Sequence, residues 1–308
     1  MTTNEVSGTQ FTEDSRVPEW TIVLAFATVY LVWGSTYLGI KVAIETIPPF
    51  YMAAGRFIIA GSILYVIARI NGAAAPGRQQ WAYTALTGVF LIAGGNGLVS
   101  LAETWIDSSM AALITASGPF IMTLFSWWGG VENRPTGRIW LSLAGGFAGV
   151  VLLIGSAEGG DSLDFLWGCL LVLVAVVLWT VASIYSKRST LKIDIWLQSA
   201  LQMFCGGLAC LFIAYGIGEF EDFDISTVSA RSWWAFVYLV MMGSLVGFTA
   251  YVFLLKHRSP SAVASHAYVN PVVAVILGWL ILGETLTLWG LIGSGVILIS
   301  VVEILRRR

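Results

Sequence analysis

The sequence predicts an all-α polytopic membrane protein with ten transmembrane helices, arranged as two inverted five-helix repeats. A shortage of charge, ten long apolar runs and an internal repeat together predict this fold. Of the 308 residues, 57% are hydrophobic and 11% are charged, and the mean hydropathy is +0.82. Soluble domains carry about 25% charged residues, so this chain is expected to have a lipid bilayer as its solvent. The net charge of −2 gives no reason to expect a nucleic-acid partner.

A helix that crosses a bilayer needs about 20 mostly apolar residues. The expected spans are residues 20–44, 48–70, 80–103, 107–129, 137–155, 165–186, 195–216, 231–255, 260–282 and 287–304. Prolines, glycines and polar residues separate these runs. Most of the 14 tryptophans lie near the ends of spans, as expected for an interfacial aromatic belt. Trp33 and Trp179 are the exceptions, because they are expected well inside their spans.

The polar segments outside the spans predict the orientation. Residues 1–19 lack the basic-then-apolar order of a signal peptide, and we expect them to form a cytoplasmic tail. The connections alternate in charge, with basic residues in 187–192 and acidic residues in 219–224. By the positive-inside rule both termini are expected in the cytoplasm, which requires an even number of spans. The expected location is the cell inner (plasma) membrane, crossed many times.

Three cysteines, Cys169, Cys205 and Cys210, all lie in apolar runs. Their odd number argues against a disulfide framework, and their spacing matches no metal site. We expect buried thiols, with no metal ion and no cofactor.

An internal repeat divides the chain into residues 20–155 and 165–305. Matched residues lie 146 positions apart at first and 152 positions apart after a longer connection in the second half. The matched pairs include Trp33 with Trp179, Gly61 with Gly207, Trp81 with Trp233, Gly95 with Gly247 and Pro119 with Pro271. Five spans per half is an odd number, so the two halves must cross the membrane in opposite directions. This pattern is typical of secondary transporters, whose binding sites lie near the midplane between the repeats.

Helix geometry places four unusual residues at similar depth. At 1.5 Å per residue, Trp33, Pro119, Trp179 and Pro271 each lie roughly 17–20 Å into their spans, near the middle of a core about 30 Å thick. We therefore expect a central polar pathway there. The candidate substrate-binding residues are Trp33, Ser35, Thr36, Tyr37, Arg56, Asn96, Thr115, Ser117, Trp179, Ser183, His266, Tyr268 and Asn270.

Several of these residues also have structural interpretations. Serine and threonine hydroxyls commonly bond back onto their own helix, and a lone histidine such as His266 is as readily structural as functional. Arg56 is expected roughly 10 Å inside its span, where a buried guanidinium is usually functional or paired; snorkelling to the outer surface is the alternative. Lys41 and Glu45 are expected at the outer interface. Glu103 is expected to be wetted as well, although it is the one carboxylate near enough to be drawn inward.

Several stretches resemble the EamA family of the drug/metabolite transporter superfamily. They are WGSTYLGIK, AAGRFIIAG, GGNGLVSLAE, SGPF and YVNPVVAVILGWLILGET, and the resemblance covers roughly residues 20–305. It implies a ten-helix fold of two inverted five-helix repeats and export of metabolites, amino acids or toxic compounds. The second repeat departs from the first at Gln202, which stands where the first repeat has Arg56. A charged contact with substrate is therefore expected in the first repeat only.

The expected function is secondary export of small metabolites by alternating access. A membrane-embedded enzyme and a passive channel are the alternatives, although the chain has only two histidines and no catalytic set at membrane depth. No Walker-type glycine loop occurs, so ATP is not expected as the direct driver. The expected partners are a small-molecule substrate and the lipid bilayer, and monomer and homodimer both stay open. Few carboxylates lie at membrane depth, which argues against an Asp/Glu proton relay and leaves exchange and facilitated transport open.

Overall fold

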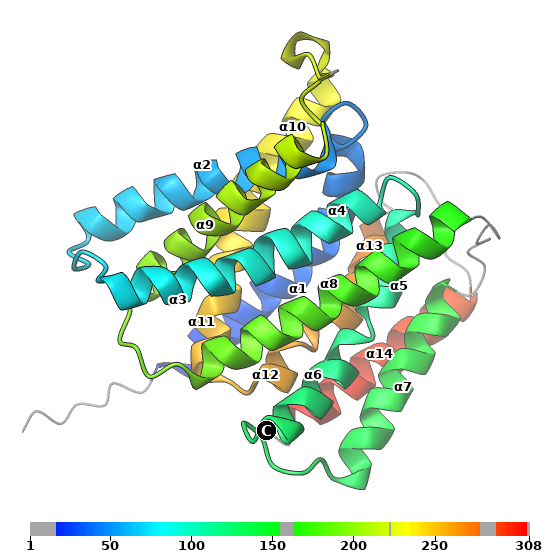
Figure 1. The fold of residues 1–308 in the computed structure, drawn as a ribbon. Coiled ribbons are helices and arrows are strands. Elements are labelled where there is room, and N and C mark those ends of the chain that lie inside the picture. The colour runs from blue at the N-terminus through cyan, green and yellow to red at the C-terminus, as the bar shows by residue number, and fades with distance from the viewer. Residues whose placement is uncertain (1–16, 155–162, 222, 278–287, 307–308) are drawn as a thin grey trace, which may run out of the picture.

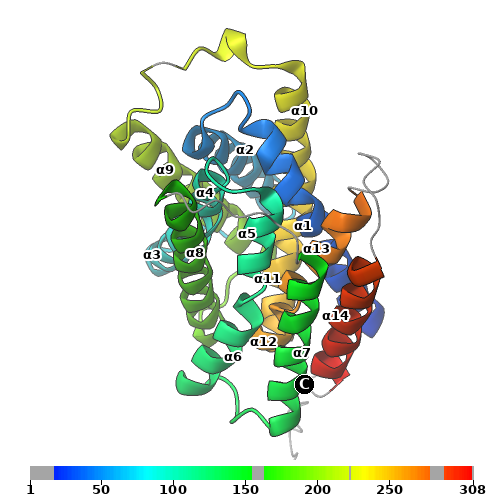
Figure 2. The same cartoon turned by 90° about the vertical axis from the view of Figure 1, so that its right-hand side faces the viewer.

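A computed structural model describes residues 17–154, 163–221, 223–277 and 288–306, and all regular secondary structure in these residues is helical. The helices pack side by side in one bundle, with α1 near its centre (Figure 1). Helices α7 and α14 lie against each other on one flank of the bundle, as a second view shows (Figure 2). The all-helical class predicted from the sequence agrees with this architecture.

Six helices in the described part of the chain are long and apolar enough to cross a membrane. Four of them are α1 (Glu19–Ala43), α2 (Pro49–Ile70), α8 (Leu163–Arg188) and α9 (Ile195–Gly216). The other two run continuously through three elements each: α3 (Arg78–Gly88), η1 (Val89–Gly97) and α4 (Leu98–Ala102), then α10 (Ala230–Tyr238), η3 (Leu239–Phe248) and α11 (Thr249–His257).

The remaining helices are shorter. They are α5 (Ser108–Thr115), α6 (Gly118–Trp128), α7 (Gly137–Ile154), η2 (Ile225–Thr227), α12 (Pro260–Val263), α13 (His266–Leu277) and α14 (Leu288–Arg306). Helices α7 and α14 correspond to the expected spans 137–155 and 287–304. Residues 155, 278–282 and 287 of the expected spans lie outside the described residues, as do residues 1–16 of the expected tail.

Two expected spans, 107–129 and 260–282, are interrupted in the structure. The first breaks at residues 116–117, between α5 and α6. Pro119 is the second residue of α6, and its nitrogen cannot donate to the carbonyl of Thr115. The second does not break at its proline, because Pro271 lies inside α13. That break comes earlier, between α12 and α13, where the hydroxyl of Ser265 donates to the carbonyl of Ala262 at 2.6 Å.

Two π-helical segments, η1 and η3, occupy corresponding places in the two long composite helices. Neither segment is predicted by the pattern of residues in the sequence. A π-helical stretch widens the helix and is frequent at functional sites. Here each segment carries one of the repeat-matched glycines, Gly95 in η1 and Gly247 in η3.

Polar side chains define the starts of several helices. Asp194 accepts a hydrogen bond from the backbone N–H of Leu197 at 3.0 Å and so caps α9, and Ser229 caps α10 by accepting from Ser232 at 3.1 Å. Helix α2 begins at Pro49 and is capped from a distance, since the carboxylate of Glu219 accepts from the N–H groups of its first turn. These caps satisfy N–H groups that have no partner within their own helix.

Helices α2 and α9 approach each other closely at two glycines. A Cβ atom on Gly61 would lie 2.6 Å from the backbone nitrogen of Phe204, and one on Gly207 would lie 2.8 Å from the backbone nitrogen of Ile58. Gly61 with Gly207, and Ile58 with Phe204, are both pairs 146 positions apart. The contact is therefore reciprocal between the two halves of the chain.

Candidate functional site

A cavity of about 100 Å³ lies in the middle of the bundle. Its wall is built by α1, α2, η1, α4, α5, α6, α8, α11 and the broken segment that contains α13. One water molecule takes about 30 Å³ of liquid volume, so the cavity holds only a few waters in this conformation. It is much smaller than the ligand pockets of about 300–1,000 Å³ that hold drug-sized molecules. A bound solute would require the surrounding helices to move apart.

Aromatic rings form one side of the cavity. The ring centroids of Trp33 and Trp179 are 5.4 Å apart in an edge-to-face arrangement, and Tyr251 lies 5.0 Å from the first and 5.1 Å from the second. His266 lies edge-on to Trp33 at 4.9 Å. Both indole N–H groups have protein acceptors, the carbonyl of Gly243 at 3.2 Å and the hydroxyl of Tyr251 at 2.7 Å. Their partners hold the indoles in place while the rings contribute to the cavity wall.

The rings of Trp33 and Trp179 each pack against a glycine of the opposite half of the chain. A Cβ atom on Gly95 would lie 2.5 Å from Cε3 of Trp179, and one on Gly247 would lie 2.6 Å from Nε1 of Trp33. This contact is reciprocal too, because the tryptophans are 146 positions apart and the glycines 152. Only glycine fits at both positions with the rings where they are.

Arg56 supplies the positive charge of the wall. Its side chain is buried, with 2% of the residue exposed, so it does not snorkel to the surface. Its Nε donates to the hydroxyl of Ser244 at 2.7 Å, and its guanidinium lies 4.6 Å from the centroid of the Phe57 ring. Among the described residues, no carboxylate oxygen lies within 4.0 Å of it. A buried guanidinium without a carboxylate partner is suited to an anionic group of a solute.

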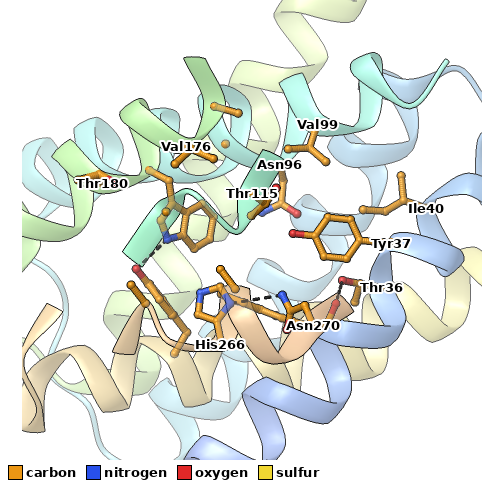
Figure 3. A pocket seen from close by; sticks show the side chains of 18 of the residues that line it. Thr36, Tyr37, Ile40, Asn96, Val99, Thr115, Val176, Thr180, His266 and Asn270 are labelled. Carbon is orange, nitrogen blue, oxygen red and sulfur yellow. Dashed lines mark hydrogen bonds between the residues drawn. The ribbon is translucent and has the colours of Figure 1, made fainter. Parts of the chain in front are cut away.

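The amide of Asn270 contributes hydrogen-bonding groups. Its Nδ2 lies 3.4 Å from Nδ1 of His266, and its Oδ1 has no hydrogen-bond partner within the described part of the chain. Figure 3 shows the hydroxyl of Tyr37 pointing into the same space as the side chains of Asn96 and Thr115. The cavity therefore combines aromatic faces, amide and hydroxyl groups and one guanidinium.

Most of the residues predicted from the sequence line this cavity. They are Trp33, Thr36, Tyr37, Arg56, Asn96, Thr115, Trp179, His266 and Asn270. Helical spacing explains the set on α1, because positions 33, 36 and 37 lie on one face of a helix. His266 and Asn270 share a face of α13 for the same reason.

The structure places four other predicted residues off the cavity wall: Ser35, Ser117, Ser183 and Tyr268. Ser35 faces away on α1 and bonds to the hydroxyl of Tyr238. Tyr268 is turned away from Asn270 on α13, and its hydroxyl donates to a backbone carbonyl of α7, that of Leu143, at 3.0 Å.

Ser183 and Ser117 also lie outside the cavity wall. Ser183 stands behind the wall and supports it, since its hydroxyl lies 2.6 Å from that of Tyr251. The hydroxyl of Ser117 is buried at the break between α5 and α6, with no hydrogen-bond partner among the described residues.

Sequence reasoning missed two polar residues of the wall, Thr180 and Tyr251, as well as its aliphatic residues, its glycines and Met122. Tyr251 could have been found through the repeat, because it lies 152 positions after Val99, which also lines the cavity. Thr180 directly follows Trp179, one of the two tryptophans that drew attention to this depth.

The expectation that Glu103 is wetted was wrong. Glu103 is 0% exposed. It directly follows α4, and α1, α5 and α8 pack around that end of the helix. Lys41 reaches the same place from α1, and its Nζ donates to the backbone carbonyls of Glu103 at 2.7 Å and Ile106 at 3.1 Å. Glu45 lies at the exposed end of α1, where it forms an ion pair with Arg231 at 3.6 Å.

Comparison with known proteins connects this geometry to transporters. The model of the EamA-like transporter family matches residues 20–155 and 166–306. The chain is 34% identical over 280 residues to "Uncharacterized inner membrane transporter YedA" of Escherichia coli (strain K12), covering 90% of this chain and 88% of that protein. It is 26% identical to "Uncharacterized transporter YvbV" of Bacillus subtilis (strain 168), covering 93% and 92% of the two chains.

A solved crystal structure has the same fold. It aligns with a TM-score of 0.75 at 20% sequence identity and covers 94% of this chain and 98% of its own. The resemblance drawn from the sequence stretches is thus confirmed at the level of the family.

Proposed function

The chain belongs to the EamA-like transporter family, and from this premise we propose that it is a secondary exporter of small metabolites, amino acids or toxic compounds. It works by alternating access in the inner membrane, where its Escherichia coli relative is named as a transporter. The observation that carries the proposal is the central cavity, which takes its aromatic and polar wall from both halves of the chain.

The reciprocal contacts support the inverted-repeat arrangement. When two surfaces are related by a two-fold axis, residue i of one contacts residue j of the other and j contacts i. Gly61 and Gly207 meet this condition, and so do the tryptophan–glycine contacts of Trp33 and Trp179. We propose ten crossings in two five-helix repeats, residues 20–155 and 165–305, with both termini in the cytoplasm. In such a fold, one repeat can rock against the other around a central binding site, which opens the site to each side of the membrane in turn.

The chemistry of the cavity favours a solute that has a carboxylate and an apolar or aromatic body. Arg56 carries a charge that no described carboxylate neutralises, and Trp33 and Trp179 present apolar ring surfaces beside it. Asn270 adds an acceptor oxygen that has no partner among the described residues. Zwitterionic amino acids, weak aromatic acids and neutral aromatics fit this description better than strong cations do.

Counterflow in proteoliposomes tests the proposal. Vesicles that contain the purified protein are loaded with one unlabelled solute and supplied with the same solute in labelled form outside. The panel comprises phenylalanine, benzoate, indole and a lipophilic cation. A carrier accumulates label transiently, whereas a channel only equilibrates it and an enzyme changes its chemical identity. Absence of counterflow for every carboxylate, with activity for the cation, would contradict the proposed substrate class.

A further inference from the structure

Resting on this proposed transport function, we propose that Glu103 is a proton-binding site that controls the outer end of the cavity. The carboxyl group of Glu103 is protonated while that end of the cavity is closed. When that end opens and water enters, the O–H bond of the carboxyl group breaks and the proton passes to water. Acid on the outer side thus favours closure.

The first ground is the burial of the Glu103 side chain. It is 0% exposed, and neither carboxylate oxygen has a hydrogen-bond partner among the described residues. An isolated ionised carboxylate is far more costly to bury than a neutral carboxylic acid, so such groups take up a proton instead. Protein side chains surround Glu103, so the carboxyl group is shielded from water wherever the membrane lies.

The second ground is the behaviour of the neighbouring cation. Lys41 does not pair with the carboxylate, since no Nζ–oxygen distance between them is within 4.0 Å. Its ammonium donates instead to the backbone carbonyls of Glu103 and Ile106. These two bonds tie α1 to the connection between α4 and α5. Opening this end must break them, which frees Lys41 to stabilise an ionised Glu103.

The third ground is position. Val99 lines the cavity and lies one helical turn before Glu103, while Tyr37 lines it and lies one turn before Lys41. The Lys41–Glu103 contact therefore stands directly beyond one end of the cavity. By the positive-inside rule that end faces outward.

The other groups around the site do not supply a competing charge. The ionisable side chains packed near it are Tyr37 on α1 and Cys169 on α8. Asp107, on the connection to α5, is exposed. Tyrosine and cysteine are ordinarily neutral at physiological pH, so Lys41 is the fixed charge beside Glu103 within the described residues.

Infrared spectroscopy of the purified protein tests protonation without any substrate. We expect the carbonyl stretching band of a buried carboxylic acid at neutral pH in the wild type. The band is retained in Glu221→Gln, which changes an exposed acid, and lost in Glu103→Gln. Its absence from the wild type would overturn the proposal, and a band that persists unchanged into alkaline pH would show a permanently neutral structural acid and overturn it as well.

Cysteine labelling tests the coupling to opening. Ile40 is buried on the cavity wall, so in a cysteine-free background Ile40→Cys reports when the outer end opens. Because a maleimide reacts with the thiolate, each rate is divided by the rate for Glu221→Cys, an exposed reference position, at the same pH. With an impermeant maleimide added outside, this normalised rate is expected to rise several-fold as external pH rises. In Glu103→Gln we expect a low normalised rate that does not change with pH, with Glu221→Gln behaving like the parent. Unchanged pH dependence in Glu103→Gln would overturn the switch, whereas labelling from the cytoplasmic side alone would contradict the proposed orientation instead.

Discussion

The indole rings of Trp33 and Trp179 meet edge to face at 5.4 Å, although the two residues are 146 positions apart in the chain. Each ring also lies against a glycine of the other half, Gly247 and Gly95 respectively. The centre of the molecule is therefore a contact between its two halves. A substitution that moves a side chain at this contact in one half displaces the residue that it contacts in the other half. Testable consequences follow from this and from the neighbouring contacts.

Gly95→Ala is expected to destabilise the protein by about 1–3 kcal/mol, the usual cost of overpacking a tight interior. The added methyl group would lie 2.5 Å from Cε3 of Trp179, so the ring must shift. Thermal unfolding in detergent measures the change. Gly295→Ala on α14 is the matched control, because nothing lies within 4 Å of its Cβ. It should be neutral or stabilise by up to about 1 kcal/mol. Equal effects of the two substitutions would argue against the Gly95–Trp179 contact.

Arg56→Gln is expected to reduce counterflow of carboxylate solutes about 10- to 100-fold while sparing neutral ones. The estimate corresponds to the loss of a charge-assisted hydrogen bond worth about 1.5–3 kcal/mol. Arg56→Lys keeps the charge but loses the planar fork, so a partial loss is expected. Arg69→Gln, on the same helix but exposed, should behave like the wild type. Equal loss for every solute, together with reduced protein abundance, would show that Arg56 is structural.

Asn270→Ala should lower counterflow about 10-fold, since it removes an amide whose Oδ1 is free of partners in the described structure and a hydrogen bond is worth about 1 kcal/mol or more. Tyr268→Phe, two residues away on α13, removes only the bond to Leu143. It should cost about 1 kcal/mol of stability and leave transport intact. Transport rates normalised to inserted protein separate the two effects. The opposite pattern would place the solute on the α7 side of α13.

The orientation of the chain can be tested with impermeant cysteine reagents. Thr190 and Glu221 are both exposed and lie beyond opposite ends of α9. We expect Glu221→Cys to be labelled from outside intact cells and Thr190→Cys only after the membrane is permeabilised. The positive-inside rule is the reason, because the connection at 187–192 is basic and that at 219–224 is acidic. Labelling of Thr190→Cys in intact cells would reverse the topology.

Glu219→Ala is expected to lower stability by about 1 kcal/mol, as the loss of a helix cap does. Its carboxylate accepts from the N–H groups of Phe50 at 3.1 Å and Tyr51 at 2.7 Å. Glu221→Ala, on the same connection, is the control. If both substitutions left the melting temperature unchanged, the capping contact would contribute nothing measurable.

The carboxyl group of Glu219 should also make the stability of the protein depend on pH. Burial raises the pKa of Glu219 above its ordinary value, against the opposing effect of the two hydrogen bonds from α2. The folded protein therefore holds this proton more tightly than the unfolded chain does. Its contribution to stability should decline as pH rises between the ordinary and the raised pKa. Glu219→Gln should remove that decline from the stability–pH profile, and a steeper profile in the variant would contradict the assignment.

The sequence by itself determined the helical class, most helix boundaries and much of the cavity wall. Apolar run length depends only on local composition, because a bilayer of fixed thickness demands about 20 residues per crossing. The repeat offset aligned Gly95 with Gly247 and Trp33 with Trp179. Positions such as 33, 36 and 37 share a helical face in any structure.

Only the tertiary structure decided which way each helix is turned. In a soluble protein the polar face marks the outside, but here lipid-facing and protein-facing surfaces are both apolar, as the exposed Leu24 and Leu31 on α1 illustrate. The pattern of residues therefore could not reveal that Tyr268 turns toward α7, or that Arg56 reaches Ser244. Nor could it show that Glu103 is enclosed, since its burial arises from the packing of α1, α5 and α8 around the end of α4. The rotation of each helix about its axis depends on contacts between segments far apart in the chain, and those contacts exist only once the helices have packed.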